Sequence, residues 1–302
     1  MALRWLLSNN FFRYWFTDYT RSDIMAQVFN DRLFHHKTFA DFRPHPKILI
    51  NSTLRNDHNR FTFTDDRFRE TLYSNLARYQ VASAVNASSS FPAVFDDVTL
   101  EQYVDPPKYF HLYDGGPTDN LGVQALMEFL IRTVTGTNLD TLLPKGCMII
   151  VVDASPASGN EGLGDRESDR TLPDYFVNTN AIDASDVMLG ELRTRLLKDT
   201  GIQRVDDDLN GTVEMPDPHH CRCEVRHVSL QHLLHRQDLP DEDDEFIKRV
   251  TRIPTNFGIS KEEQDDLFRA AKLLVTELAE SKLLPNDSMT TNCGSQERKS
   301  KK

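Results

Sequence analysis

The chain has 302 residues, of which 39% are hydrophobic and 27% are charged, and its formal net charge at pH 7 is −11. This length and composition suit one or two globular units with a full core, and no transmembrane span is visible. The acidic balance argues against a nucleic-acid partner, because phosphate binding needs a concentrated basic surface. The 4 scattered cysteines do not predict a disulfide framework, so we expect a reducing, cytoplasmic location.

Aromatic side chains crowd the N-terminal segment, and two interpretations of it stay open. The pair Leu6-Leu7 is followed by Ser8-Asn9-Asn10 and by no small-residue cleavage site, so we predict no signal peptide. One interpretation is a helix that packs in a core or on an upstream segment. The other is an interfacial helix that makes peripheral contact with a membrane through Trp5, Phe11, Phe12 and Trp15.

The first third of the chain predicts short helices and a hairpin. Apolar residues at helical spacing indicate a helix over residues 22–33. Residues 46–51 are typical of a buried strand and residues 60–64 alternate as a second strand, so together they predict a hairpin. Helical spacing returns over residues 66–84, and small residues near its end allow close packing against a sheet.

The central part of the chain indicates the fold class. Residues 108–113 alternate as a strand, Gly115-Gly116 end it in a tight turn, and a helix follows from Val123. Residues 147–153 form a continuous apolar run, which is typical of a strand covered on both faces in a parallel sheet. We therefore predict an α/β fold with a mainly parallel sheet flanked by helices.

The C-terminal part continues this pattern and then becomes polar. It predicts a helix over residues 175–198, a strand near the sheet edge over residues 223–230, and a final helix capped by Ile259-Ser260. The polar end predicts a disordered tail over residues 285–302. Residues 1–284 are then one α/β domain with a C-terminal helical extension.

A carboxylate stands at the end of the predicted strand 108–113. Asp114 precedes the two glycines, and ligands of open α/β sheets bind at the carboxyl ends of strands. Asp-Gly is also a favoured turn dipeptide, so this motif alone favours a simple turn.

Two motifs together carry a resemblance to a known family. Ala87-Ser88-Ser89-Ser90-Phe91-Pro92-Ala93-Val94-Phe95 is followed by Asp114-Gly115-Gly116 and then by Asn120-Leu121-Gly122. This order resembles the C-terminal half of the catalytic domain of patatin-like phospholipases. The later segment Arg252-Ile253-Pro254-Thr255-Asn256-Phe257 resembles the distal end of bacterial members.

The resemblance implies a lipid acyl hydrolase that uses a Ser-Asp dyad and no cofactor. Asp114 would accept the serine proton or orient the hydroxyl, and the turn at Gly115 and Gly116 would direct the carboxylate. The substrate would be a phospholipid or another acyl ester. The residues expected to line the pocket are Ser88, Ser89, Ser90, Pro92 and Asn120.

The chain departs from the family pattern at the nucleophile. No two of its 13 glycines lie four positions apart, so G-x-S-x-G is absent, and so is the glycine-rich loop that supplies oxyanion donors. The resemblance therefore implies that the N-terminal strands of the domain are missing. Ser155, Ser158 or one of Ser88 to Ser90 would be the alternative nucleophile, although none has flanking glycines on both sides.

Two functional hypotheses remain at this point. The chain is either the aspartate-bearing half of a lipid hydrolase, inactive alone and associated with a chain that carries the missing half, or a non-catalytic module that binds lipid or a partner. A metal site is not predicted: His219, His220, Cys221, Cys223 and His227 lack a second ligand pair at ordered spacing, which favours a His-rich loop entering a strand.

Overall fold

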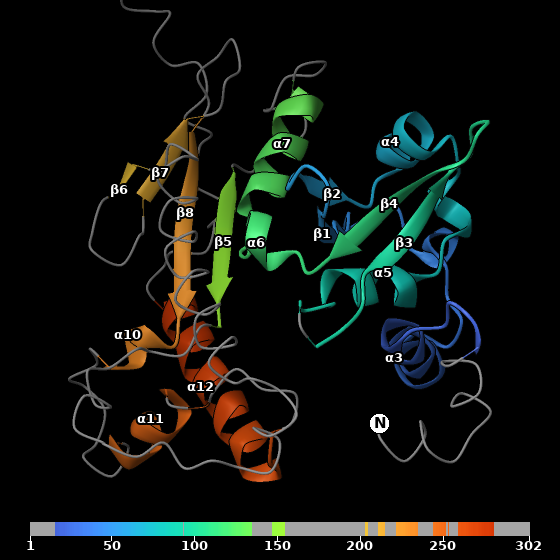
Figure 1. Ribbon diagram of the computed structural model, residues 1–302. Helices are drawn as coiled ribbons and strands as arrows, with labels where there is room; N and C mark the ends of the chain where they lie inside the picture. Colours follow the sequence, from blue (N-terminus) through green and yellow to red (C-terminus); the bar gives the residue numbers. More distant parts are fainter. Residues whose placement is uncertain are drawn as a thin grey trace, which may run out of the picture. The chain divides into compact units, whose positions relative to one another are not determined.

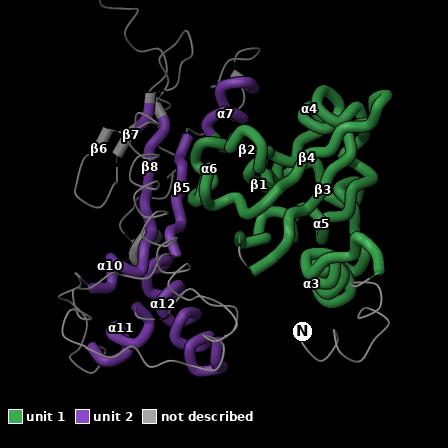
Figure 2. Tube along the Cα trace, in the orientation of Figure 1, with its two compact units in different colours: residues 1–126, 170–196 green, residues 127–169, 197–302 purple. Residues whose placement is uncertain are grey.

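The computed structural model describes residues 16–92, 94–134, 147–154, 203–204, 211–214, 222–234, 244–251, 253 and 259–280 (Figure 1). The chain forms two compact units, the first described from residue 16 to 126 and the second from residue 127 to 280 (Figure 2). Each unit has its own sheet and its own core. The N-terminal aromatic residues, the predicted helix at 175–198 and the tail at 285–302 lie outside the described residues.

The first unit alternates short helical segments with short strands. Its elements are α3 (Arg21–Phe29), π-helical Asn30–Phe34, 3₁₀-helical Phe39–Asp41, β1 (Asn51–Leu54), β2 (Arg60–Thr62), α4 (Asp65–Arg67), π-helical Phe68–Leu72, 3₁₀-helical Leu76–Arg78, α5 (Val81–Ser88), β3 (Val98–Gln102), β4 (Lys108–Tyr113), α6 (Gly116–Asp119) and the start of α7 (Val123–Val134). The predicted helix at 22–33 is confirmed by α3. Thr20 caps it, accepting a hydrogen bond from the Asp23 N–H while the Asp23 carboxylate accepts one from the Thr20 N–H.

The sheet of the first unit is antiparallel throughout. Its order is β2-β1-β4-β3, and each of its three pairings is antiparallel. The hairpin predicted from residues 46–64 is confirmed, with its first strand shifted to β1. Residues 55–59 join β1 to β2 and residues 103–107 join β3 to β4. Connections this short can return the chain only in the opposite direction, because a parallel pair needs a long crossover.

The predicted helix at 66–84 is wrong in extent. The structure has α4, two irregular turns and then α5 over this stretch. Tyr73 takes a left-handed conformation with φ of 52°, which ends the first helical segment although no glycine marks the place. Asn75 then accepts a hydrogen bond from the Ala77 N–H and starts a new turn. Only α5 therefore packs as a helix of more than two turns here.

The core of the first unit is built from aromatic residues of the hairpin and aliphatic residues of the sheet. Phe61 and Phe63 are buried with ring centroids 5.2 Å apart, and Phe68 packs against both. Leu112 of β4 is fully buried in the same cluster, as are Ala84 and Ala87 of α5. The small residues let α5 lie close across one face of the sheet (Figure 1).

The second unit contains a mixed sheet and a helical layer. Its elements are β5 (Met148–Asp153), β6 (Gln203–Arg204), β7 (Gly211–Glu214), β8 (Arg222–Ser229), α10 (Gln231–Leu234), α11 (Asp244–Thr251) and α12 (Lys261–Glu280). The strand order is β5-β8-β7-β6, in which β5 and β8 are parallel and the other pairs antiparallel. The expectation of a mainly parallel sheet is not confirmed, since only this pair is parallel among the strands that the structure describes.

Two further expectations about these strands need correction. The strand predicted near the sheet edge at 223–230 is β8, which lies between β5 and β7. The strand predicted to be covered on both faces is β5, but Ile150 and Val152 are 45% and 68% exposed. A continuous apolar run therefore marked a strand with one buried face.

One disulfide was not anticipated from the scattered cysteines. Cys147 and Cys223 are bonded, with their Cα atoms 4.6 Å apart and a separation of 76 positions in the sequence. Parallel pairing of β5 and β8 brings them together, because Met148 is in register with Glu224.

The final helix is confirmed together with its cap. The Ser260 hydroxyl accepts from the Glu263 N–H at 3.1 Å and the Glu263 carboxylate accepts from the Ser260 N–H at 2.5 Å. Ala270 and Leu274 of α12 are buried against Phe246 and Val250 of α11. Among the helices that the structure describes, none has both the length and the apolar character needed to cross a membrane.

The aromatic cluster makes a testable prediction about the first unit. Phe61→Ala removes a fully buried ring and should lower the free energy of unfolding by about 3–5 kcal/mol in urea titration. Tyr103→Ala is the control, because that side chain is 63% exposed, and it should change stability far less. Equal effects of the two substitutions would contradict the position of the core.

Candidate active site

Asp114 follows β4 at the point where this strand meets the C-terminal end of α5. The Asp114 N–H donates to the Ser90 carbonyl at 3.0 Å, and the Gly115 N–H donates to the Ser88 carbonyl at 3.1 Å. Helix-terminal carbonyls have no partner within their own helix, so these bonds satisfy α5 as well as the strand end. The two predicted motifs are therefore in direct contact through their backbones.

The carboxyl group of Asp114 is partly buried and held on one side. Its Oδ1 accepts a hydrogen bond from the Gly116 N–H at 2.7 Å. Burial raises the pKa of this carboxyl above its ordinary value, and the hydrogen bond from Gly116 opposes part of that rise. A carboxyl group with a raised pKa is suited to accept and return a proton near neutral pH.

Gly115 allows a close backbone approach that no other residue permits. A Cβ atom placed there would lie 2.6 Å from the Asn51 carbonyl oxygen of β1. Gly116 is also buried and begins α6, with Pro117 in the first turn. The requirement for glycine at Gly115 is therefore steric, whereas Gly122 has φ of 69° and open space around its Cα.

The hydroxyl groups of Ser89 and Ser90 are hydrogen-bonded to the backbone of α5. The Ser89 hydroxyl donates to the Val85 carbonyl at 2.9 Å, and the Ser90 hydroxyl donates to the Asn86 carbonyl at 2.8 Å. Ser90 is fully buried, while Pro92 is exposed. The structure thus brings Ser88 to Ser90 beside Asp114, and their role in lining a pocket stays a prediction.

Asp119, at the far end of the glycine turn, is a second buried aspartate next to the candidate site. Its side chain is completely buried and accepts hydrogen bonds from the Gln124 N–H at 3.2 Å and the Ala125 N–H at 2.8 Å. Arg60 lies 3.7 Å from its Oδ2. Asn120, predicted to line the pocket, is exposed, and that role too stays a prediction.

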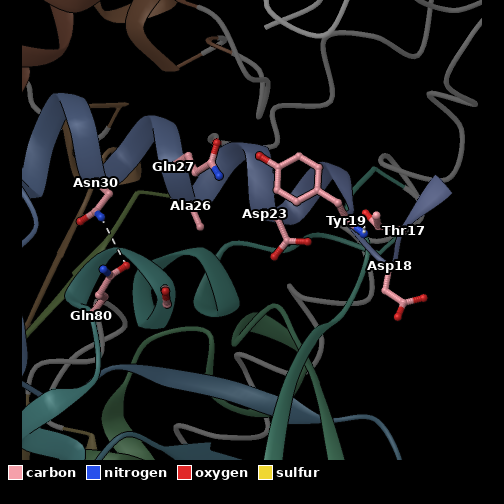
Figure 3. A pocket seen from close by; sticks show the side chains of 9 residues that line it. Thr17, Asp18, Tyr19, Asp23, Ala26, Gln27, Asn30 and Gln80 are labelled. Carbon is pink, nitrogen blue, oxygen red and sulfur yellow. Dashed lines mark hydrogen bonds between the residues drawn. The ribbon is translucent and has the colours of Figure 1, made fainter. Parts of the chain in front are cut away.

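A cavity of about 510 Å³ lies beside α3 and the start of α5 (Figure 3). None of the predicted site residues lines it. Asn30 bridges its two sides by donating to the Gln80 side chain at 3.3 Å. The lining residues are Thr17, Asp18, Tyr19, Asp23, Ala26, Gln27, Asn30, Gln80 and Ser83.

Of the histidine cluster of the sequence, the structure describes Cys223, which is in the disulfide, and His227. His227 pairs with the buried Asp153 at 3.2 Å, so it joins β8 to β5 in the second unit. No group of three or more His, Cys, Asp or Glu side chains among the described residues is arranged to hold a metal ion. Ser155, Ser158, His219, His220 and Cys221 lie outside those residues.

The close approach at Gly115 can be tested by substitution. Gly115→Ala should lower the free energy of unfolding by about 1–3 kcal/mol, because β1 or the turn must move to admit the methyl group. Gly122→Ala is the comparison: it meets no neighbour and should cost about 1–2 kcal/mol through its left-handed backbone alone. Only Gly115→Ala should also change the NMR chemical shifts of Asn51, and unchanged shifts would argue against the contact.

Burial of Asp114 also predicts how stability depends on pH. The folded chain binds the Asp114 proton more tightly than the unfolded chain, whose carboxyl keeps a pKa near 3.8. The stabilisation of the folded chain by this proton is therefore fully present below pH 3.8, and it is lost as the pH rises through the raised pKa of the folded state. Asp114→Asn, which can still accept from Gly116, should be more stable than the parent at pH 7 and equally stable at pH 3 in urea titrations. A parent that is the more stable at pH 7 would contradict this.

Comparison with known families bears on the segment that contains these contacts. Residues 2–127 match the family model described as patatin-like phospholipase. No curated protein and no solved structure matches the chain. The matched region includes residues 87–95, 114–116 and 120–122, which carried the resemblance, whereas residues 252–257 lie outside it. The similarity of this chain to patatin-like phospholipases is thus found over residues 2–127.

Proposed function

We propose that the chain carries the aspartate-bearing part of a lipid acyl hydrolase, in which Asp114 is the carboxylate of a Ser-Asp dyad. The observation that carries the proposal is the Asp114 carboxyl group, partly buried at the end of β4 and inside the family match. The pKa of this carboxyl is raised by burial, as a proton acceptor requires.

The proposed chemistry uses the two oxygens of Asp114 differently. Oδ1 accepts from the Gly116 N–H, which leaves Oδ2 to take the proton of the nucleophilic serine. As that O–H bond breaks, the serine oxygen attacks the ester carbonyl, and the C–O bond to the leaving alcohol then breaks. Asp114 returns the proton to the alcohol. Water, activated by the same carboxylate, next hydrolyses the acyl-serine and releases the fatty acid.

Two of the described serines beside Asp114, Ser89 and Ser90, are poorly placed to be the serine of this dyad. Ser89 and Ser90 donate their hydroxyl protons to backbone carbonyls of α5, and the 302 residues contain no G-x-S-x-G. We infer that the nucleophile and the oxyanion donors come from a segment outside residues 1–302, in the same protein or in an associated chain. The 302-residue chain alone should then lack hydrolase activity.

The absence of a nucleophile motif also favours a second candidate function. A chain with the same fold but without a nucleophilic serine would act as a non-catalytic module that binds lipid or a partner chain. Peripheral membrane contact through Trp5, Phe11, Phe12 and Trp15 would serve either function. This contact and a cytoplasmic location stay predictions, and the four aromatic residues lie outside the described part of the chain.

A fluorophosphonate probe distinguishes these candidates. The purified 302-residue chain is incubated with the probe, and labelled peptides are identified by mass spectrometry. We expect no labelled serine and no hydrolysis of p-nitrophenyl acyl esters or phospholipid. A version extended to include G-x-S-x-G should be labelled at that serine and should hydrolyse phospholipid.

Substitution of Asp114 in the extended version tests the dyad. Asp114→Asn keeps the acceptor for Gly116 but cannot take a proton, so hydrolysis should fall by at least about 100-fold. Asp66→Asn is the matched control, because Asp66 is exposed and pairs only with Arg69 among the ion pairs of the described residues. Retained hydrolysis in Asp114→Asn would exclude Asp114 from the mechanism. An extended chain that binds phospholipid vesicles without hydrolysis would favour the non-catalytic module.

A further inference from the structure

Asp119 has more partners than a helix cap needs. Its side chain is fully buried, and burying a carboxylate is costly unless hydrogen bonds and an opposite charge compensate for the lost water. Two N–H groups of the first turn of α7 and the Asn51 amide donate to it, and the Arg60 guanidinium lies 3.7 Å away. These partners come from β1, β2 and α7, which are separate elements.

The same partners also contact one another, so they form a closed network. Arg60 is 13% exposed and donates to the Gln124 side chain at 3.1 Å and to the Thr62 hydroxyl at 3.2 Å. The Thr62 hydroxyl in turn donates to the side-chain amide oxygen of Asn51 at 2.9 Å. The network therefore links the β1–β2 hairpin to the start of α7 by several bonds, and Asp119 is at its centre.

The network lies at one end of the short segment that begins with Asp114. Residues 115–118 connect Asp114 to Asp119, and the last residue of this segment is held by a hydrogen bond of 2.9 Å between the Thr53 and Thr118 hydroxyls. On the other side Asp114 is fixed by the carbonyl groups of α5. A turn this short transmits a displacement of Asp119 to Gly116, whose N–H holds the Asp114 carboxylate.

We propose that Asp119, together with Arg60 and Asn51, forms a clasp that positions the Asp114 carboxylate. These three are positioning residues rather than catalytic residues, since they act through the backbone of the turn. The inference rests on the proposed function only for the chemical role of Asp114, because the orientation of its carboxylate is measurable without any substrate.

The clasp is tested by titrating the Asp114 carboxyl in the 302-residue chain with carbon-detected NMR, using Asp114→Asn to assign the signal. Burial raises the Asp114 pKa more than the Gly116 hydrogen bond lowers it. If the turn is released into water, both influences weaken, and the pKa should fall because the larger one is lost. Asp119→Asn should therefore move the titration midpoint of Asp114 downward by about half a unit or more.

Two controls separate positioning from stability. Leu76→Ala removes a buried core side chain of the same unit, so it should lower the unfolding midpoint and leave the Asp114 titration unchanged. Asp66→Asn should change neither. If Asp119→Asn does not fold, Arg60→Lys replaces it, because a lysine keeps the charge but loses the bonds to Gln124 and Thr62.

An unchanged Asp114 midpoint in a folded Asp119→Asn or Arg60→Lys variant would overturn the clasp, whatever the loss of stability. This test measures only the Asp114 titration and does not depend on hydrolysis. The clasp can therefore fail while the Ser-Asp dyad stands, and the dyad can fail while the Asp114 carboxylate is still shown to be positioned by Asp119.

Discussion

Two backbone hydrogen bonds join the end of α5 to the end of β4, and the geometry around Asp114 depends on them. The last carbonyls of a helix and the first N–H groups beyond a strand both need partners when they are buried. Here the Ser88 and Ser90 carbonyl groups accept hydrogen bonds from the Gly115 and Asp114 N–H groups, so the end of the helix and the end of the strand supply each other's partners. Because Gly115 also lies against the Asn51 carbonyl, three elements meet at one backbone position. Main-chain atoms thus fix the start of the turn at Asp114 and Gly115, and the side chains of the proposed clasp act at its other end, at Asp119.

The two aspartates on either side of the glycine turn have opposite surroundings. Asp119 is surrounded by donors and a guanidinium group, which favour a carboxylate that stays in place. Among the described residues, the Asp114 carboxyl accepts one hydrogen bond, from the Gly116 N–H, and it is partly buried. These surroundings raise its pKa and so favour uptake and release of a proton. Five positions apart in the sequence, the same residue type is therefore suited to a structural role and to a chemical one.

Local signals in the sequence were sufficient for several elements, including the strand and the turn that carry Asp114. Alternation predicted β4, the glycines predicted the turn, and a capping pair predicted the start of α12, because each depends on residues close together in the chain. The break at Tyr73 was not predictable, since a tyrosine carries no mark of a left-handed conformation. The pairing of Cys147 with Cys223, the place of β8 inside its sheet and the contact of Arg60 with Asp119 all depend on long-range packing. Neither composition nor spacing encodes which distant partner a residue meets.

The disulfide between β5 and β8 changes how the chain is connected. It closes residues 147–223 into a covalent ring, with the two cysteines 76 positions apart. A single cut of the backbone anywhere inside that ring would leave the N-terminal and C-terminal pieces attached to each other until a reductant was added. Parts of the chain on either side of such a cut would therefore migrate as one molecule, and the Asp114 segment would remain tethered to α12.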